Sequence, residues 1–254
     1  MLTRSKAPTM SPESSSVDVI KWGVIGLGDV CTIKAGPAFY KARGSTLVAV
    51  MRRTPGKAQS WIDGNIKANK FPSDVAESIR GYESVEIMLQ EATPDALYVA
   101  TPPGAHLEVI RQIVNSSSAS TVKAVYVEKP CGRCAWETRA IVDELSRRNI
   151  KFYPAYVSMA HERTQKIIEL LGNKAVGDRI TRVQYIQRGT SFARGLTENT
   201  GGVTGSTIPW RLNAEQSGGG LIMDMGCHIL SRIDYLFGEH YFSQGSSIFF
   251  VSSC

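Results

Sequence analysis

Short runs of apolar, often β-branched residues alternate along the chain with stretches of amphipathic, helical spacing. The runs predict strands over residues 19–25, 46–51, 96–100 and 122–127. The stretches between and after them predict helices over residues 30–43, 55–62, 107–114 and 136–147. Strands that are nearly all apolar and are separated by helices are typical of a parallel sheet covered on both faces. The sequence therefore predicts an α/β fold with a doubly wound parallel sheet.

The pattern changes after about residue 155. We expect a helix over residues 163–171, a strand over 179–187, a long Gly- and Thr-rich loop over 189–207, and an apolar helix that ends near Phe237. The first 18 residues are rich in Ser, Pro and Thr and predict a disordered tail. We accordingly expect a first domain over residues 19–150 and a second region of different architecture over residues 151–254.

Composition limits the classes of function. A net charge of +6 suits an anionic small molecule, but Lys and Arg are scattered rather than gathered in a basic stripe, which argues against nucleic acid. The chain has no apolar run of the roughly 20 residues that cross a bilayer. It has five cysteines and no secretory signal, which favours free thiols and a cytoplasmic protein, with organelle import left open.

A glycine-rich turn follows the first predicted strand and opens a helix. Residues Gly26, Leu27, Gly28, Asp29 and Val30 form this turn. The first Gly permits a tight turn, the second lets the backbone approach a pyrophosphate, and the helix N-terminus offers amide groups to that anion. Cys31 replaces the third Gly of the usual fingerprint. The turn predicts a dinucleotide site, with a simple strand-to-helix turn as the alternative.

The end of the second strand carries positive rather than negative charge. NAD-binding units usually place a carboxylate here for the ribose 2′-hydroxyl. This chain has Arg52 and Arg53, with Lys57 one helical turn later. Guanidinium groups match phosphate oxygens, so the sequence favours NADP(H), with NAD as the alternative.

Several segments, taken in order, resemble the glucose–fructose oxidoreductase and inositol dehydrogenase (Gfo/Idh/MocA) family. They are the Gly26-Leu27-Gly28 turn, the run from Val99 to His106, the run Val127-Glu128-Lys129-Pro130, the pair Trp210-Arg211, and the run from Gly218 to His228. The resemblance implies a Rossmann domain followed by an α+β domain with a large open sheet. It also implies a nicotinamide cofactor and a sugar, polyol or related carbonyl substrate.

The resemblance also implies residue roles. Lys129 is expected to contact the nicotinamide ribose and the substrate hydroxyl, His228 to be the acid/base, and Asp224 its partner. Thr101, Pro102, His106, Glu128, Trp210 and Arg211 are expected to line the cofactor site. No metal is expected. Each residue also has a plainer interpretation, as a surface lysine, a helix cap, a core histidine or a packed tryptophan. Many family members have Asp three residues after the histidine, where this chain has Ser231.

The C-terminal segment does not resemble the family's continuation. The family's sheet is completed after the His-containing helix, whereas residues 241–254 have a different character. We therefore expect an incomplete second domain, poor solubility or partner dependence, and a homo-oligomer through the open sheet only if that sheet is complete. Two alternatives remain: a catalytically silent dinucleotide-binding or interaction protein, and thiol chemistry at Cys131-Gly132-Arg133-Cys134.

Overall fold

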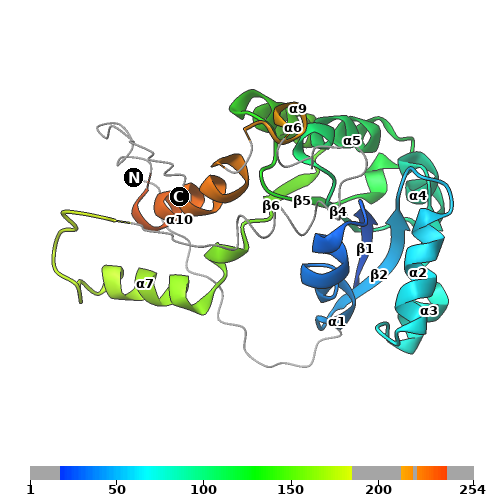
Figure 1. Ribbon diagram of the computed structural model, residues 1–254, viewed down its shortest axis with the longest axis horizontal. Helices are drawn as coiled ribbons and strands as arrows, with labels where there is room; N and C mark the ends of the chain where they lie inside the picture. Colours follow the sequence, from blue (N-terminus) through cyan, green and yellow to red (C-terminus); the bar gives the residue numbers. More distant parts are fainter. Residues whose placement is uncertain (1–17, 185–212, 220–221, 239–254) are drawn as a thin grey trace, which may run out of the picture.

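The computed structural model describes residues 18–184, 213–219 and 222–238. Its centre is a six-stranded parallel sheet in the order β3-β2-β1-β4-β5-β6 (Figure 1). The strands are β1 Ile20–Ile25, β2 Ser45–Met51, β3 Arg80–Tyr82, β4 Ala96–Val99, β5 Ala124–Val127 and β6 Lys151–Pro154. This strand order is that of a Rossmann domain, so the expected doubly wound parallel sheet is confirmed.

Helices cover both faces of the sheet. They are α1 Ala38–Lys41, α2 Lys57–Lys67, α3 Ser73–Ser78, α4 Val85–Ala92, α5 Pro103–Asn115 and α6 Ala135–Arg147. Because side chains alternate along a strand, Val24 and Tyr98 face α1 to α3, whereas Ile25, Leu97 and Val99 face α4 to α6. The two buried clusters that result hold the sheet between its helices, and so they position the edge at which the strands end.

The helix expected over residues 30–43 is interrupted. It consists of a five-residue π-helix, η1 Val30–Lys34, and the short α1, with Gly36 and Pro37 between them. A Cβ at Gly36 would lie 1.7 Å from the carbonyl oxygen of Cys31, so the chain turns sharply where only glycine fits. Proline then prevents the first helix from simply continuing.

Sequence patterning missed several short elements of the sheet domain. It did not anticipate β3, β6, α3 or α4. Strand β6 pairs with β5 from Lys151 to Pro154, so the sheet runs four residues past the expected boundary at residue 150. These elements are three to eight residues long, and a short apolar run carries little periodicity.

The second region, as far as the structure describes it, is helical. Its elements are the short 3₁₀ turn η3 Val157–Met159, α7 Glu162–Gly172, α9 Ala214–Ser217, the π-helix η5 Ile222–Gly226 and α10 Cys227–Phe237. The expected strand over 179–187 is absent from its described part, residues 179–184. Figure 1 shows α9 beside α5 and α6, with α7 and α10 at the far side of β6. No helix within the described ranges is long and apolar enough to span a membrane.

Candidate dinucleotide and active site

The loops that follow β1, β2 and β4 meet at the carboxyl edge of the sheet. The amide of Gly26 donates to the carbonyl of Met51 at 3.0 Å, and the amide of Ala100 donates to the carbonyl of Ile25 at 2.8 Å. These bonds join the three loops next to the point where strand order reverses, between β1 and β4. Ligands of open α/β sheets bind at such a reversal.

The two glycines of the first loop meet different surroundings. Gly26 has φ +99°, and a Cβ there would lie 2.8 Å from the backbone carbon of Ala100. It is therefore required by the fold itself. A Cβ at Gly28 would meet nothing within 4 Å. The missing side chain at Gly28 leaves open space above the backbone, which is the space a pyrophosphate needs.

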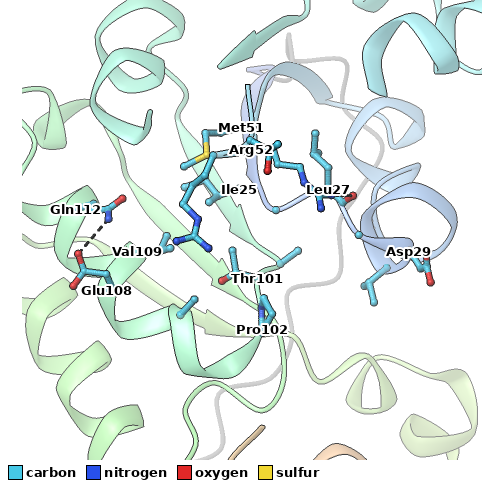
Figure 2. Close-up of a pocket in the computed structure, with 17 residues that line it drawn as sticks. Ile25, Leu27, Asp29, Met51, Arg52, Thr101, Pro102, Glu108, Val109 and Gln112 are labelled. Carbon is cyan, nitrogen blue, oxygen red and sulfur yellow. Dashed lines mark hydrogen bonds between the residues drawn. The ribbon is translucent and has the colours of Figure 1, made fainter. Parts of the chain in front are cut away.

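A pocket of about 590 Å³ lies over this turn, within the size range of ligand sites. Figure 2 shows side chains from the first turn, the end of β2, the loop after β4 and α5 around it. Of the expected cofactor residues, it is lined by Gly26, Leu27, Gly28, Asp29, Val30, Arg52, Arg53, Thr101 and Pro102. Lys57 is exposed and does not line the pocket.

Sequence reasoning missed the other half of the pocket wall. The additional lining residues are Ile25, Met51, Thr54, Ala100, Ala105, Glu108, Val109 and Gln112. Glu108 and Gln112 lie four residues apart on α5, and the Gln112 amide donates to the Glu108 carboxylate at 3.2 Å (Figure 2). That spacing, one helical turn after the Thr101-Pro102 loop, is the signal that could have identified this wall.

The two arginines after β2 are not equivalent. Arg52 donates from its guanidinium to the carbonyl of Leu27 at 3.1 Å, so it ties the end of β2 to the glycine turn (Figure 2). Arg53 is also exposed and lines the same pocket. Both therefore put positive charge beside the turn, and Arg52 in addition supports the turn's backbone.

Two polar side chains of the next loop differ in their burial and partners. Thr101 lines the pocket, and its hydroxyl is buried and has no hydrogen-bond partner among the described residues. Such an orphaned group is what a bound ligand would satisfy. His106 is fully buried and does not line the pocket. Its Nε2 lies 2.7 Å from the carbonyl of Thr101 and its Nδ1 lies 3.0 Å from the carbonyl of Cys131.

His106 is thus a bridge between two loops. Burial lowers its pKa, against the opposing effect of the two carbonyls and of Glu137. From sequence, His106 was open to cofactor contact or to a place at the start of a helix with no ligand. The structure places it in the first turn of α5, outside the pocket wall, where it joins the loop after β4 to the loop after β5.

The loop after β5 reaches the second region. Glu128 accepts a hydrogen bond from the buried Tyr98 hydroxyl, and it also accepts one from the amide of Lys129 at 3.1 Å. Burial and then the Glu128 carboxylate raise the pKa of Tyr98, which keeps the phenol protonated as the donor. Glu128 is thereby anchored in the sheet. The next peptide bond, Lys129–Pro130, is cis.

Lys129 and Asp224 come together from segments 95 residues apart. The lysine ammonium donates to the Asp224 carboxylate at 2.7 Å and to its carbonyl at 3.0 Å. Their side chains are 16% and 18% exposed, so water screens the pair only weakly. The sequence did not predict this ion pair, because the family resemblance implies Asp224 as the partner of His228.

His228 lies in the first turn of α10, after the π-helix that carries Asp224. Burial lowers its pKa, Lys129 lowers it further, and Asp224 acts in the opposite direction. The imidazole is therefore neutral near pH 7 and can accept a proton. A π turn precedes α10, so Asp224 and His228 do not share one regular α-helix, and the Asp224 carboxylate binds the Lys129 ammonium. Trp210 and Arg211 lie outside the described residues.

The first thiol of the Cys-x-x-Cys segment, that of Cys131, has little reactivity. Cys131 is buried, and burial raises its pKa to about 12. Cys134 is exposed at the start of α6, and both cysteines are free. No group of three or more His, Cys, Asp or Glu side chains within the described ranges is arranged to hold a metal ion.

Comparisons with known proteins agree with this geometry. Residues 20–156 match the model of the "oxidoreductase family, NAD-binding Rossmann fold", and residues 165–244 match the "GFO/IDH/MocA C-terminal domain". The chain is 33% identical to Oxidoreductase P35 of Formosa agariphila over 87% of its own length and 61% of that protein. It is 26% identical to D-xylose 1-dehydrogenase (NADP(+)) 2 of Haloferax volcanii over 62% of its length and 42% of that protein.

A solved structure shows the same fold. The Lactobacillus casei scyllo-inositol dehydrogenase with bound NAD(H) and scyllo-inositol superimposes with a TM-score of 0.62. The match has 24% identity and covers 87% of this chain and 56% of that one. The chain thus spans between two fifths and about three fifths of the lengths of these relatives.

Proposed function

Because the chain belongs to the GFO/IDH/MocA family of oxidoreductases, we propose that it binds NADP(H) and transfers hydride between the nicotinamide and a sugar, polyol or related carbonyl compound. The observation that carries this proposal is the pocket over Gly28, where open space above the glycine meets the positive charge of Arg52 and Arg53.

The residues around the pocket fit a dinucleotide. The pyrophosphate would rest on the backbone of Gly28 and the amides that follow it, and the orphaned Thr101 hydroxyl would bond a ribose or nicotinamide group. A 2′-phosphate would meet Arg53, because Arg52 already donates to the Leu27 carbonyl. The names of the relatives include both NADP(+) and NAD(H), so the preference needs a direct test.

The bound cofactor supplies or accepts the hydride. The chain's own groups handle the proton and the charge. Neutral His228 accepts the proton of a substrate hydroxyl during oxidation, and its protonated form returns that proton during reduction. The ammonium of Lys129, oriented by Asp224, stabilises the negative charge that develops on that oxygen.

Fluorescence titration tests the cofactor preference. NADPH and NADH are titrated into the full chain, and tryptophan quenching gives the two dissociation constants. We expect NADPH to bind at least about tenfold more tightly, since a bidentate charged contact is worth about 1.5–3 kcal/mol. Arg53→Ala should remove most of that difference and leave NADH binding unchanged. Equal affinities in the unmodified chain would contradict the NADP(H) assignment.

Turnover is tested separately on a panel of polyols, aldoses and aldehydes. His228→Ala should lower turnover by about 10²–10⁴-fold and leave the dissociation constant for NADPH unchanged. Cofactor binding without turnover on any substrate would instead support a catalytically silent dinucleotide-binding protein.

A further inference from the structure

Arg133 contacts two parts of the molecule at once. It lies four residues after Lys129, in the loop that leads from β5 to α6. Its Nε donates to the Glu137 carboxylate at 2.8 Å, and its backbone amide donates to the same carboxylate at 2.7 Å. One terminal nitrogen also donates to that carboxylate, and the other donates to the carbonyl of Glu215 in α9 at 2.8 Å. The guanidinium thus joins the Rossmann domain to the short helix that precedes Asp224.

The Glu137 carboxylate holds this guanidinium in one orientation. The Glu137 side chain is 8% exposed, whereas the Arg133 side chain is 40% exposed. The bonds from Arg133 outweigh the effect of burial and lower the pKa of Glu137. Because the buried carboxylate accepts hydrogen bonds from Nε and one terminal nitrogen of Arg133, the other terminal nitrogen is left to donate to α9. Glu137 therefore sets the direction in which Arg133 reaches.

Two glycines allow the backbones of the same two regions to approach closely. Gly218, just after α9, has φ +81°, and a Cβ there would lie 2.4 Å from the carbonyl oxygen of Arg133. A Cβ at Gly104, in the first turn of α5, would lie 3.1 Å from the carbonyl oxygen of Glu215. The backbones of the two regions therefore touch on both sides of the Arg133 bond, and no side chain separates them.

Asp224 follows Gly218 by only six residues. The loop after β5 therefore holds the second region at two points: Lys129 binds Asp224, and Arg133 binds the backbone of α9. A single flexible lysine does not fix the orientation of a segment, but two attachments on one rigid loop do.

We propose that Arg133, held by Glu137, is a positioning residue that latches α9 onto the Rossmann domain and so fixes the place of Asp224 and His228 beside Lys129. This inference rests on the proposed function for its catalytic consequence. The latch itself is a property of the fold and is testable without turnover. The latch consists of Arg133, Glu137, the Glu215 carbonyl and Gly218.

Arg133→Lys tests the latch with little threat to folding. A lysine keeps a cation beside Glu137, but its single ammonium cannot also serve the Glu215 carbonyl in the fork geometry of a guanidinium. Arg139→Lys is the matched control, because Arg139 is exposed on α6, the helix that carries Glu137. Gly218→Ala approaches the latch from its other side, since its Cβ would push α9 away from Arg133.

Hydrogen–deuterium exchange of the full chain is the first readout. In Arg133→Lys and Gly218→Ala we expect amides of residues 214–217 and 222–228 to exchange at least about tenfold faster than in Arg139→Lys, with the sheet strands unchanged. Steady-state kinetics is the second readout. We expect kcat to fall by about ten- to a hundredfold while KM for the cofactor stays within about twofold, because only the second region is displaced.

Unchanged exchange over residues 214–228 in both variants would overturn the latch, whatever happens to turnover. If the unmodified chain turned over no substrate, the proposed function would fail, and the exchange data would still decide the latch.

Discussion

The cofactor pocket and the Lys129–Asp224 junction are built in different ways. The pocket comes from three adjacent loops at one edge of a single sheet, and Gly26 locks them together through backbone contacts. The junction joins residues 95 apart in sequence through side chains. Under the proposed function, cofactor binding is therefore a local property of the Rossmann domain, whereas proton transfer depends on how the second region is held.

That difference separates two kinds of failure. A defect at the junction should remove turnover and spare cofactor binding, and a defect at the glycine turn should remove binding or the fold. Substitutions at the two sites distinguish these outcomes, and the largest effect is expected at the junction.

Replacing Lys129 tests the junction. Lys129→Met should lower turnover by about 10²–10³-fold, because the charge that stabilises the developing alkoxide is lost. The affinity for NADPH should change far less. Lys123→Met is the control: Lys123 also binds an aspartate at 2.7 Å, but its side chain is 78% exposed. Steady-state rates and NADPH titration measure both effects, and a Lys129→Met enzyme as fast as the Lys123→Met enzyme would refute the role of Lys129.

Replacing Gly26 tests how the pocket loops are locked. Gly26→Ala should lower the free energy of unfolding by at least about 2 kcal/mol, because the left-handed conformation costs about 1–2 kcal/mol and the methyl group meets Ala100. Gly64→Ala, in the exposed interior of α2, should instead stabilise by about 0.5–1 kcal/mol. Urea unfolding measures both, and equal midpoints for the two variants would contradict the account.

The pH dependence of stability gives the smallest effect. Because the pKa of His228 is lowered in the folded protein, the unfolded chain binds a proton first as pH falls below about 6.5. Stability is then constant above that pH and decreases below it, with buried His106 acting in the same direction. His228→Gln should make the decrease between pH 7.5 and 5.5 smaller. An unchanged decrease, measured by urea unfolding at the two pH values, would place His228 in solvent rather than in a buried site.

The sequence predicted well where the signal is local. The strand, Gly26-Leu27-Gly28 turn and charged end of β2 lie within about 30 residues, and a βαβ unit of that length has few ways to fold. The family resemblance then supplied Lys129, Asp224 and His228, of which the first two meet in the structure.

The remaining features depend on tertiary contacts. His106 has a suitable side chain for cofactor contact, but only the fold shows that carbonyls of two loops enclose it. Arg133 and Glu215 are hydrogen-bonded although they lie 82 residues apart in the sequence, and no spacing rule connects such positions. Similarly, the π turns at Val30 and Ile222 interrupt segments that the sequence pattern predicts as regular helices.

Calorimetric titration of NADPH into the Gly28→Ala variant tests the central claim most directly. A methyl group at Gly28 enters open space, so the fold should tolerate it, but it would occupy the place proposed for the pyrophosphate. We expect the dissociation constant to rise at least about tenfold, which is about 1.4 kcal/mol, while Gly64→Ala binds like the unmodified chain. Equal NADPH affinity in the folded Gly28→Ala and Gly64→Ala variants would contradict a dinucleotide seated on this turn.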